Sequence, residues 1–189
     1  MMQYICKNYE LDGVVLMNAK KFIDNRGVFF ESYNEQQLVD IIGLPHKFVQ
    51  DNFSISKKNV FRGFHYQDSD NAQGKLVSVI KGKVIDIIID IRRYSKTFGQ
   101  HLKFELSAEN GDALWIPRGF AHGFISLEED TIFHYKVDNL YNKESERSIS
   151  LFDAELNLEL DKMGYHMNDF NISDKDRTAG KLSTTNYGY

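Results

Sequence analysis

Two short stretches of this chain carry the residue types best suited to chemistry. The first, VFRGFHYQ, spans residues 60–67 and places Arg62, Gly63 and His65 within four positions. Its apolar and aromatic residues are typical of a β-strand, in which successive side chains face opposite sides. On that alternation Arg62 and Phe64 face one side of the strand, and Gly63 and His65 face the other.

The second stretch, LWIPRGFAHGF, spans residues 114–124 and sets His122 behind a Pro-x-Gly turn. An imidazole suits proton transfer near neutral pH because its pKa is about 6.5. A lone strand histidine is more often structural than catalytic, but here both histidines lie beside a glycine and a cation. We therefore expect two distant strands to bring His65 and His122 to one pocket.

One helix is predicted early in the chain. Asn34 suits the N-cap, Gln37 falls at the third helical position, and Gly43 ends the helix. The apolar face of this helix consists of Leu38, Ile41 and Ile42.

Most of the remaining chain has the pattern of β-strands. Residues 76–91 form two β-branched runs joined at Lys81-Gly82-Lys83, which predicts a hairpin. Further short strands are predicted at 100–106, 112–117, 122–127 and 131–137. Many short strands at regular spacing favour a sandwich or barrel over a parallel α/β sheet, so the fold class is mainly β.

The chain of 189 residues is predicted to be a single domain, with a core at about 12–160 and a C-terminal extension at 161–189. The extension loses the strand pattern, and its polar end, TTNYGY, is expected to be partly ordered. With 42% apolar and 26% charged residues, the composition is that of a soluble globular protein.

Charge and composition argue against several partners. The formal net charge of −4 argues against nucleic-acid binding, and the single cysteine, Cys6, rules out an intramolecular disulfide. No apolar run approaches eighteen residues, and the N-terminus lacks the apolar core of a signal peptide. We therefore expect no membrane partner and a cytoplasmic location.

The segment from Gly111 to His122 fits Gly-x5-Pro-x-Gly-x2-His, the second motif of the cupin superfamily. The first cupin motif normally supplies His-x-His and a carboxylate, which together hold a metal. Here the corresponding region offers only His65, followed by Tyr66 and Gln67. Because a transition metal needs three to four ligands, a site without metal is the better interpretation.

Several ordered motifs closely resemble the dTDP-4-dehydrorhamnose 3,5-epimerase family. The resemblance is nearly continuous from about residue 12 to 155, and ISDKD at 172–176 echoes it near the end. It implies a cupin-type jelly roll (a double-stranded β-helix barrel) with a short helix in the N-terminal half and a few C-terminal helical turns. It also implies a homodimer that binds a nucleoside-diphosphate 4-keto-6-deoxy sugar without metal or organic cofactor. The motifs are FIDNRGVFFESYN (22–34), FVQDNFSISKKNVFRGFHYQ (48–67), AQGKLVSVIKGKVIDIIIDIR (72–92), TFGQ (97–100) and residues 114–124.

Inverting C3 or C5 of a 4-keto sugar requires a base, a stabiliser for the enolate and an acid on the opposite face. The resemblance implies His65 as the base, Asp176 as the carboxylate that orients it and Tyr135 as the acid. Lys75 matches the cation near the carbonyl oxygen, and His122 would hydrogen-bond the sugar ring or the same oxyanion.

The resemblance also implies the nucleotide contacts. Arg26, Arg62 and Lys175 match positions for the diphosphate, which suits cationic side chains. The remaining implied contacts are Gln50, Asn52, Glu31, Glu146 and the aromatic Tyr141. Arg26 and Glu31 are expected to reach the neighbouring subunit's pocket, so that monomeric variants would lose activity.

The chain departs from the family at 151–153, where Leu-Phe-Asp replaces Trp-Asn-Asp, and at Leu140, where tyrosine is common. A Trp-Pro that commonly follows is also replaced, by LELDKMGY. We expect these changes at the rim that shapes substrate choice. Alternatives to a 3,5-epimerase of a dTDP sugar therefore stay open: a 3-only or 5-only epimerase, or one acting on a GDP- or CDP-linked sugar, including a heptose. A non-catalytic sugar-binding cupin and a metal-dependent cupin dioxygenase are further alternatives.

Overall fold

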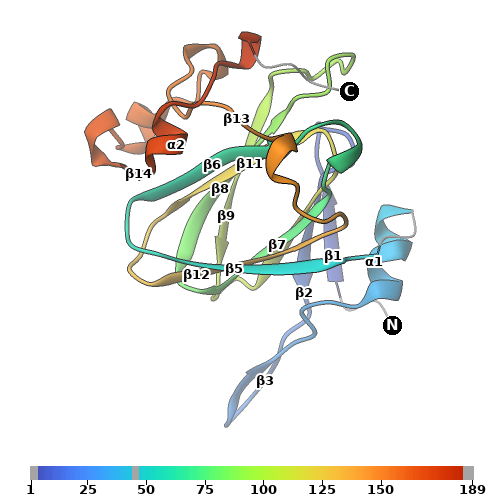
Figure 1. The fold of residues 1–189 in the computed structure, drawn as a ribbon. Coiled ribbons are helices and arrows are strands. Elements are labelled where there is room, and N and C mark those ends of the chain that lie inside the picture. The colour runs from blue at the N-terminus through green and yellow to red at the C-terminus, as the bar shows by residue number, and fades with distance from the viewer. Residues whose placement is uncertain (1–3, 44–46, 185–189) are drawn as a thin grey trace.

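The computed structural model describes residues 4–43 and 47–184, which form two large β-sheets lying face to face (Figure 1). Neighbouring strands are antiparallel, except that β14 joins β6 in parallel. The first sheet has the order β1 (Tyr4–Asn8), β2 (Val15–Ala19), β10 (Asp112–Ile116), β7 (Lys75–Lys81), β12 (Thr131–Val137), β5 (Gln50–Ser56). The second has the order β13 (Glu146–Ser148), β6 (Val60–Gln67), β11 (Phe120–Ser126), β8 (Lys83–Asp90), β9 (His101–Ser107), with β14 (Asn171–Ile172) beside β6.

This arrangement is the jelly roll expected for a mainly β cupin. The core between the sheets draws on β7, β10 and β12 of the first sheet and on β8, β9 and β11 of the second. Among its residues are Val77, Leu114, Phe133, Ile88, Leu106 and Phe124. Alternate residues of each strand enter this layer, because side chains of a strand alternate between its two faces.

Each sheet has a second apolar layer on its outer face. Helix α1 (Glu35–Ile42) packs Leu38 against β1, β2, β7 and β10 of the first sheet. The segment after β13 covers the second sheet with 3₁₀ turns, with β14 and with α2 (Asp174–Arg177), and it buries Phe170, Ile172 and Leu182. The 3₁₀ turns of this segment are η3 (Ala154–Leu156), η4 (Leu160–Met163), η5 (Met167–Asp169) and η6 (Leu182–Thr184); two others, η1 (Ser69–Asn71) and η2 (Lys143–Ser145), precede β13.

The predicted helix is confirmed, with both of its ends. The Asn34 side chain accepts a hydrogen bond from the Gln37 backbone N–H, and Gly43 ends the helix in the left-handed conformation at φ 74°. The strands predicted between 100 and 137 are present as β9 to β12, within one or two residues at each end. The C-terminal extension is folded as far as residue 184, and the end of TTNYGY lies outside the described residues.

The predicted hairpin at Lys81-Gly82-Lys83 is wrong. Strand β7 belongs to the first sheet and β8 to the second, so the chain crosses between sheets at Gly82 instead of folding back. Gly82 has φ 81°, and a Cβ there would lie 2.5 Å from the Thr131 hydroxyl oxygen. Gly82 therefore lets the chain pass from one sheet to the other. Such a crossover uses the same residue types as a tight hairpin turn, so the sequence does not distinguish the two.

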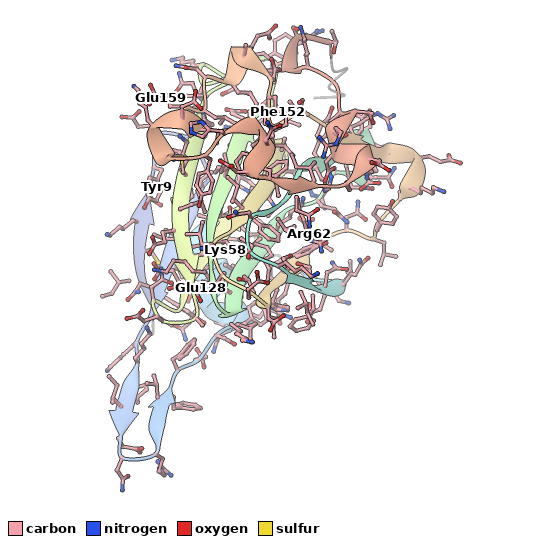
Figure 2. All side chains as sticks on the ribbon, turned by 90° about the vertical axis from the view of Figure 1, so that its left-hand side faces the viewer. Tyr9, Lys58, Arg62, Glu128, Phe152 and Glu159 are labelled. Carbon is pink, nitrogen blue, oxygen red and sulfur yellow. The ribbon has the colours of Figure 1, made fainter. Side chains whose placement is uncertain are left out.

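A small hairpin projects from the body of the molecule. Strands β3 (Phe22–Asp24) and β4 (Gly27–Phe29) pair only with each other, and the blue hairpin stands clear of the sheets in both views (Figures 1 and 2). Arg26 lies at its tip, bound to Asp24 at 2.6 Å. Among the described residues, no helix has the length and apolar character needed to cross a bilayer.

Candidate active site

A cavity of about 590 Å³ opens between the two sheets, beside the C-terminal segment. Its size is that of a small-molecule site. Both sheets contribute walls, β6 and β11 on one side and β5, β7 and β12 on the other. Nine of the residues singled out from the sequence line it: His65, Tyr135, Asp176, Lys75, Arg62, His122, Tyr141, Glu146 and Lys175.

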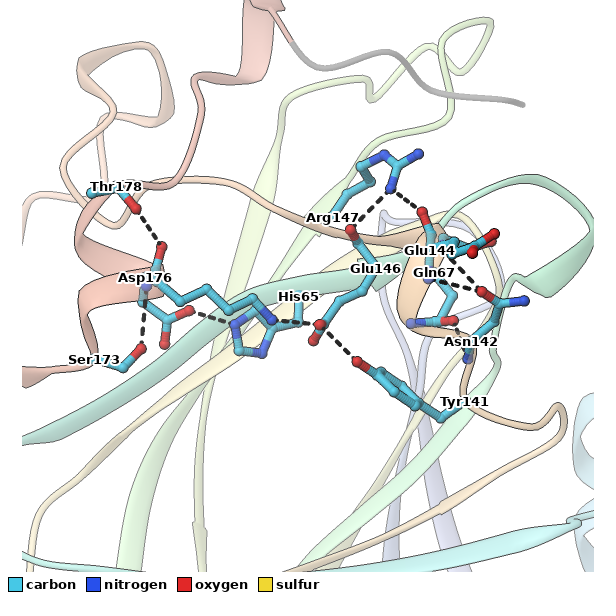
Figure 3. Close-up of polar contacts among 12 residues, drawn as sticks. His65, Gln67, Tyr141, Asn142, Glu144, Glu146, Arg147, Ser173, Asp176 and Thr178 are labelled. Atoms are coloured by element: carbon cyan, nitrogen blue, oxygen red, sulfur yellow. Dashed lines mark hydrogen bonds and ion pairs between the residues drawn. The ribbon is translucent and has the colours of Figure 1, made fainter.

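His65 is held by a buried carboxylate. Its Nε2 lies 2.5 Å from Oδ1 of Asp176, which α2 presents from the C-terminal segment (Figure 3). Burial favours the neutral acid, but hydrogen bonds from His65, Ser173 and the Gly63 backbone prevail and lower the pKa of Asp176. An ionised Asp176 fixes the imidazole with Nε2–H as donor, which leaves Nδ1 free to accept a proton.

His122 lies beside His65 and has its own carboxylate. The two histidines are direct neighbours across β11 and β6. His122 Nε2 lies 2.7 Å from Oδ2 of Asp86 on β8, a side chain that is 0% exposed. Asp86 was not predicted as a site residue, although an acidic residue within the apolar run IDIIID is a usable signal, because a buried carboxylate needs a partner.

Lys75 begins β7 and reaches across the cavity from the first sheet toward the second. Its Nζ donates to the carbonyl oxygen of His65 at 3.3 Å, and the residue is only 7% exposed. Burial lowers the pKa of Lys75 to about 8, although Asp86 and Glu146 favour the charged form. The Lys75 amine is therefore mostly protonated at neutral pH, and little water screens its charge.

Tyr135 lies on β12 of the first sheet, so it faces the cavity from the wall opposite His65. Burial raises the pKa of the Tyr135 phenol, with a contribution from the Glu146 carboxylate and against the influence of Arg62. The hydroxyl consequently keeps its proton over the neutral range and is placed to donate it.

Arg62 and His65 both line the cavity, so the strict alternation expected along β6 is wrong. The pairing of β6 with β11 shifts register between His122 and Phe124, opposite Gly63. Beyond this bulge Phe64 packs with Phe61 in the outer apolar layer, and His65 returns to the cavity. The interruption is what lets a cation and an imidazole three residues apart share one face.

Glu146 binds two other residues, Lys175 and Tyr141, at the edge of the cavity. Its Oε2 lies 2.6 Å from Lys175 Nζ and accepts a hydrogen bond from the Tyr141 hydroxyl at 3.0 Å (Figure 3). Burial opposes ionisation, but the contacts from Lys175 and Tyr141 lower the pKa of Glu146. Strand β13, α2 and the loop after β12 are thereby tied together around one carboxylate.

Four residues implied by the resemblance do not line this cavity. Arg26 lies on the projecting hairpin, and Glu31 accepts a hydrogen bond from the Gln37 side chain at 2.8 Å, near α1. Gln50 and Asn52 lie on β5, opposite Val137 and Tyr135 in the strand pairing, so they border the cavity without entering its lining.

Comparison with known proteins decides the family. The model of the dTDP-4-dehydrorhamnose 3,5-epimerase family matches residues 8–184. The chain belongs to this family. It is 52% identical to the dTDP-4-dehydrorhamnose 3,5-epimerase of Salmonella typhimurium over 146 residues, which cover 77% of this chain and 80% of that protein.

Solved structures agree with the family assignment. The dTDP-4-dehydrorhamnose 3,5-epimerase of Elizabethkingia anophelis superposes with a TM-score of 0.91 at 41% identity, covering 98% of this chain and 100% of that one. The dTDP-6-deoxy-D-glucose-3,5-epimerase of Legionella pneumophila, solved in complex with dTDP-4-keto-L-rhamnose, superposes with a TM-score of 0.90 at 40% identity. It covers 97% of this chain and 95% of that one.

The departure from the family pattern at 151–153 lies outside the cavity lining, contrary to the expectation that it shapes the rim, whereas Leu140 lies next to a lining residue. Leu151 is buried in the outer layer of the second sheet, and Asp153 binds the Leu182 backbone N–H at 2.6 Å. Leu140 is exposed beside Tyr141, which does line the cavity. The replacement of Trp-Asn-Asp therefore affects how the C-terminal segment packs, outside the cavity lining.

The residues described by the structure include no cluster of three or more histidine, cysteine, aspartate or glutamate side chains suited to a metal ion. His65 and His122 are instead each engaged by one carboxylate. A reaction without metal or organic cofactor stays a prediction, which metal analysis of the purified protein would test.

Proposed function

We propose that this chain inverts C3 and C5 of a dTDP-4-keto-6-deoxyhexose, as an isomerase of the dTDP-4-dehydrorhamnose 3,5-epimerase type. One observation carries the proposal: His65 and Tyr135 face the same cavity from opposite sheets. A hexose between them would meet a proton acceptor on one face and a proton donor on the other. Inversion of a carbon next to a carbonyl needs this arrangement.

In the first step His65 removes the proton from the carbon next to the C4 carbonyl, and the electrons of that bond move into the carbonyl to form an enolate. Asp176 stabilises the resulting imidazolium and keeps the ring oriented. General base catalysis of this kind contributes about 10²- to 10⁴-fold in rate.

Lys75 is the residue best placed to stabilise the enolate oxygen. Its buried ammonium acts where water does not screen it, and a donor of this kind is worth about 3 kcal/mol in the transition state. His122, oriented by Asp86, supplies a second hydrogen-bond donor to the same oxygen or to a ring hydroxyl.

In the second step Tyr135 donates its hydroxyl proton to the same carbon from the opposite face, and the enolate collapses to the ketone. The phenolate recovers a proton from solvent, and His65 releases the one it took, so the enzyme returns to its starting state. Repetition of the two steps at the other carbon would give the double inversion.

The nucleotide would lie along the outer part of the cavity. Arg62 and Lys175 supply positive charge for the diphosphate, since both side chains border the cavity. Tyr141 and Glu146 border it as well, and Gln50 and Asn52 lie next to it with amides that suit a base or sugar.

We also propose a homodimer in the cytoplasm, with Arg26 and Glu31 entering the partner's cavity. The projecting hairpin carries four exposed apolar residues, Phe22, Ile23, Val28 and Phe29. The outer side of the first sheet exposes Phe53, Ile55 and Ile80. Apolar surface of this extent is typical of a protein interface, which supports association through these two regions.

The proposal is tested by incubating the purified protein with dTDP-4-keto-6-deoxyglucose in deuterium oxide. NMR should show deuterium at both C3 and C5. A coupled 4-ketoreductase should then reduce the product to a dTDP-linked rhamnose. Exchange at one carbon alone would indicate a 3-only or 5-only epimerase. Absence of exchange with dTDP-, GDP- and CDP-linked keto sugars would contradict an epimerase function.

A further inference from the structure

Strand β5, at the edge of the first sheet, carries a row of polar residues on its inner face. Paired residues on antiparallel strands share a face. Asn52 pairs with Tyr135, and Ser54 pairs with Phe133, so the row faces the cavity and the core between the sheets. Its four members are Gln50, Asn52, Ser54 and Ser56.

Ser54 differs from the other three residues of this row. Gln50 donates to the Asn52 side chain at 2.8 Å, and Ser56 accepts a hydrogen bond from Arg62 at 3.1 Å. The Ser54 hydroxyl is shielded from solvent and, within the described part of the chain, has no hydrogen-bond partner. A hydroxyl withdrawn from water without a partner destabilises the fold, so its retention in a cavity wall suggests that a ligand supplies the partner.

The position of Ser54 indicates which part of a ligand that would be. Residues two apart on a strand lie about 6.6 Å from each other. On one side of Ser54 is Asn52, which faces Tyr135, where the sugar would react. On the other side is Ser56, over which the Arg62 guanidinium lies. Ser54 therefore lies between the sugar end and the diphosphate end of the cavity wall.

We propose that Ser54 is a further substrate-binding residue, whose hydroxyl donates a hydrogen bond to an oxygen of the sugar-linked phosphate. This assignment rests on the proposed function. Ser54 lines the cavity, and rotation about its Cα–Cβ bond between staggered positions is the movement by which its hydroxyl would reach the ligand. Hydrogen bonds to a charged phosphate are stronger than those to neutral acceptors, so this contact on β5 and the Arg62 guanidinium on β6 would hold the phosphate from the two walls of the cavity.

The test compares dTDP with dTMP, which lacks the sugar-linked phosphate, by isothermal titration calorimetry. Ser54→Ala should weaken dTDP about tenfold and leave dTMP unchanged, which is the loss expected for a hydrogen bond to a charged acceptor. In steady-state assays KM should rise by about the same factor while kcat stays within about twofold. Ser54→Thr keeps the hydroxyl on a residue that suits a strand, and it should retain dTDP affinity within about threefold.

Ser126→Ala is the matched control, because it removes a buried hydroxyl that donates to the Glu128 carbonyl outside the cavity. It should bind dTDP like the wild type. Equal dTDP affinities of Ser54→Ala and wild type, or equal losses for dTDP and dTMP, would overturn the assignment of Ser54. Wild-type protein that binds no dTDP would instead contradict the proposed function, and the Ser54 assignment would fall with it.

Discussion

At the scale of single residues, the proposed base and acid are held in different ways. His65 is fixed by a hydrogen bond to a carboxylate, whereas the reactivity of Tyr135 is set mainly by burial. A base must gain a proton and lose it again, so a neighbouring anion helps it. An acid that starts neutral needs only to keep its proton until the enolate has formed.

Replacing His65 by asparagine should separate chemistry from folding. The amide fills similar space and still donates to Asp176, but it cannot accept a proton from carbon. We expect kcat to fall by at least about 10³-fold, with dTDP affinity and the thermal unfolding midpoint nearly unchanged. His166→Asn, at an exposed histidine paired with Asp161, is the control and should keep full activity. A His65→Asn variant that still exchanges deuterium would rule out His65 as the base.

Lys75 should give activity and stability opposite dependences on pH. In the proposed reaction turnover needs the ammonium ion, so kcat/KM, which reports the free enzyme, should decline as pH rises through the folded pKa of about 8. Between that value and 10.5, the ordinary value, the unfolded chain binds more protons at this residue. Its contribution to the free energy of unfolding therefore rises with pH over this window.

Urea titrations of wild type and Lys75→Met across pH 7 to about 10 measure that contribution as a difference between the two proteins. Other titrating groups largely cancel in such a comparison. A kcat/KM that keeps rising beyond about pH 9, or a stability difference that does not change with pH, would contradict the assigned roles of burial and charge.

At the scale of elements, the C-terminal segment forms part of the cavity wall. It covers the outer layer of the second sheet, joins the edge of β6 through β14 and then turns into α2, which carries Lys175 and Asp176. The register of Ile172 against Phe61 thus sets where Asp176 meets His65. Packing changes in this segment should therefore alter the orientation of His65.

The close approach of the paired strands β6 and β11 depends on glycine. A Cβ on Gly63, whose φ is 135°, would lie 2.4 Å from the Gly123 Cα, a backbone atom that cannot move aside alone. Gly63→Ala should therefore lower the free energy of unfolding by about 3 kcal/mol or more. Gly164→Ala is the control: its φ is 81° but nothing lies within 4 Å, so it should cost only about 1 kcal/mol. Urea titration of both variants measures the difference, and similar losses would contradict the steric argument.

Much of this architecture could be predicted from the sequence because its signals are local. The caps of α1, the strands from β9 to β12 and the motif residues around His65 and His122 each follow from neighbouring residue types. The predictions failed where distant segments decide the outcome. Gly82 looked like a hairpin turn because the sequence does not show which sheet receives the next strand, and the bulge at Gly63 depends on its contact with β11.

Asp86 and Ser54 were missed for related reasons. Neither belongs to a recognisable motif, and each becomes significant only when its surroundings are known. Asp86 needs His122, which lies 36 positions away in the chain. The significance of Ser54 depends on the burial of its hydroxyl without a partner among the described residues, which the sequence does not show. The residues at 151–153 were expected at the rim of the cavity because they differ from the family pattern, but they lie outside its lining. A difference from a family pattern does not indicate where a residue lies relative to the cavity.

At the scale of the whole molecule, the proposed dimer assigns Arg26 and His65 of one active site to different chains. We expect heterodimers of Arg26→Ala with His65→Asn to recover activity, since one of their two sites combines an intact His65 with an intact Arg26. Co-expression with two affinity tags isolates these heterodimers, which should reach about half the wild-type kcat per dimer.

The matched control places both substitutions in one chain and pairs it with a wild-type chain. If Arg26 acts in the partner's site, this heterodimer has no complete site and stays at about half the activity of the Arg26→Ala homodimer. If Arg26 acts in its own site, the two heterodimers exchange results, and the shared-site proposal fails. Light scattering checks that both preparations are dimers.

The placement of His65 and Tyr135 on facing sheets has a consequence for how stereochemical outcome can diverge among such enzymes. The gap between the two groups is set by the side chains packed between the layers, Phe133 and Phe124 among them, whose rings stack 4.2 Å apart. Larger or smaller side chains at these packed positions would widen or narrow the gap without changing His65 or Tyr135. Selection acting on interior volume alone could thus shift which ring carbon is reprotonated.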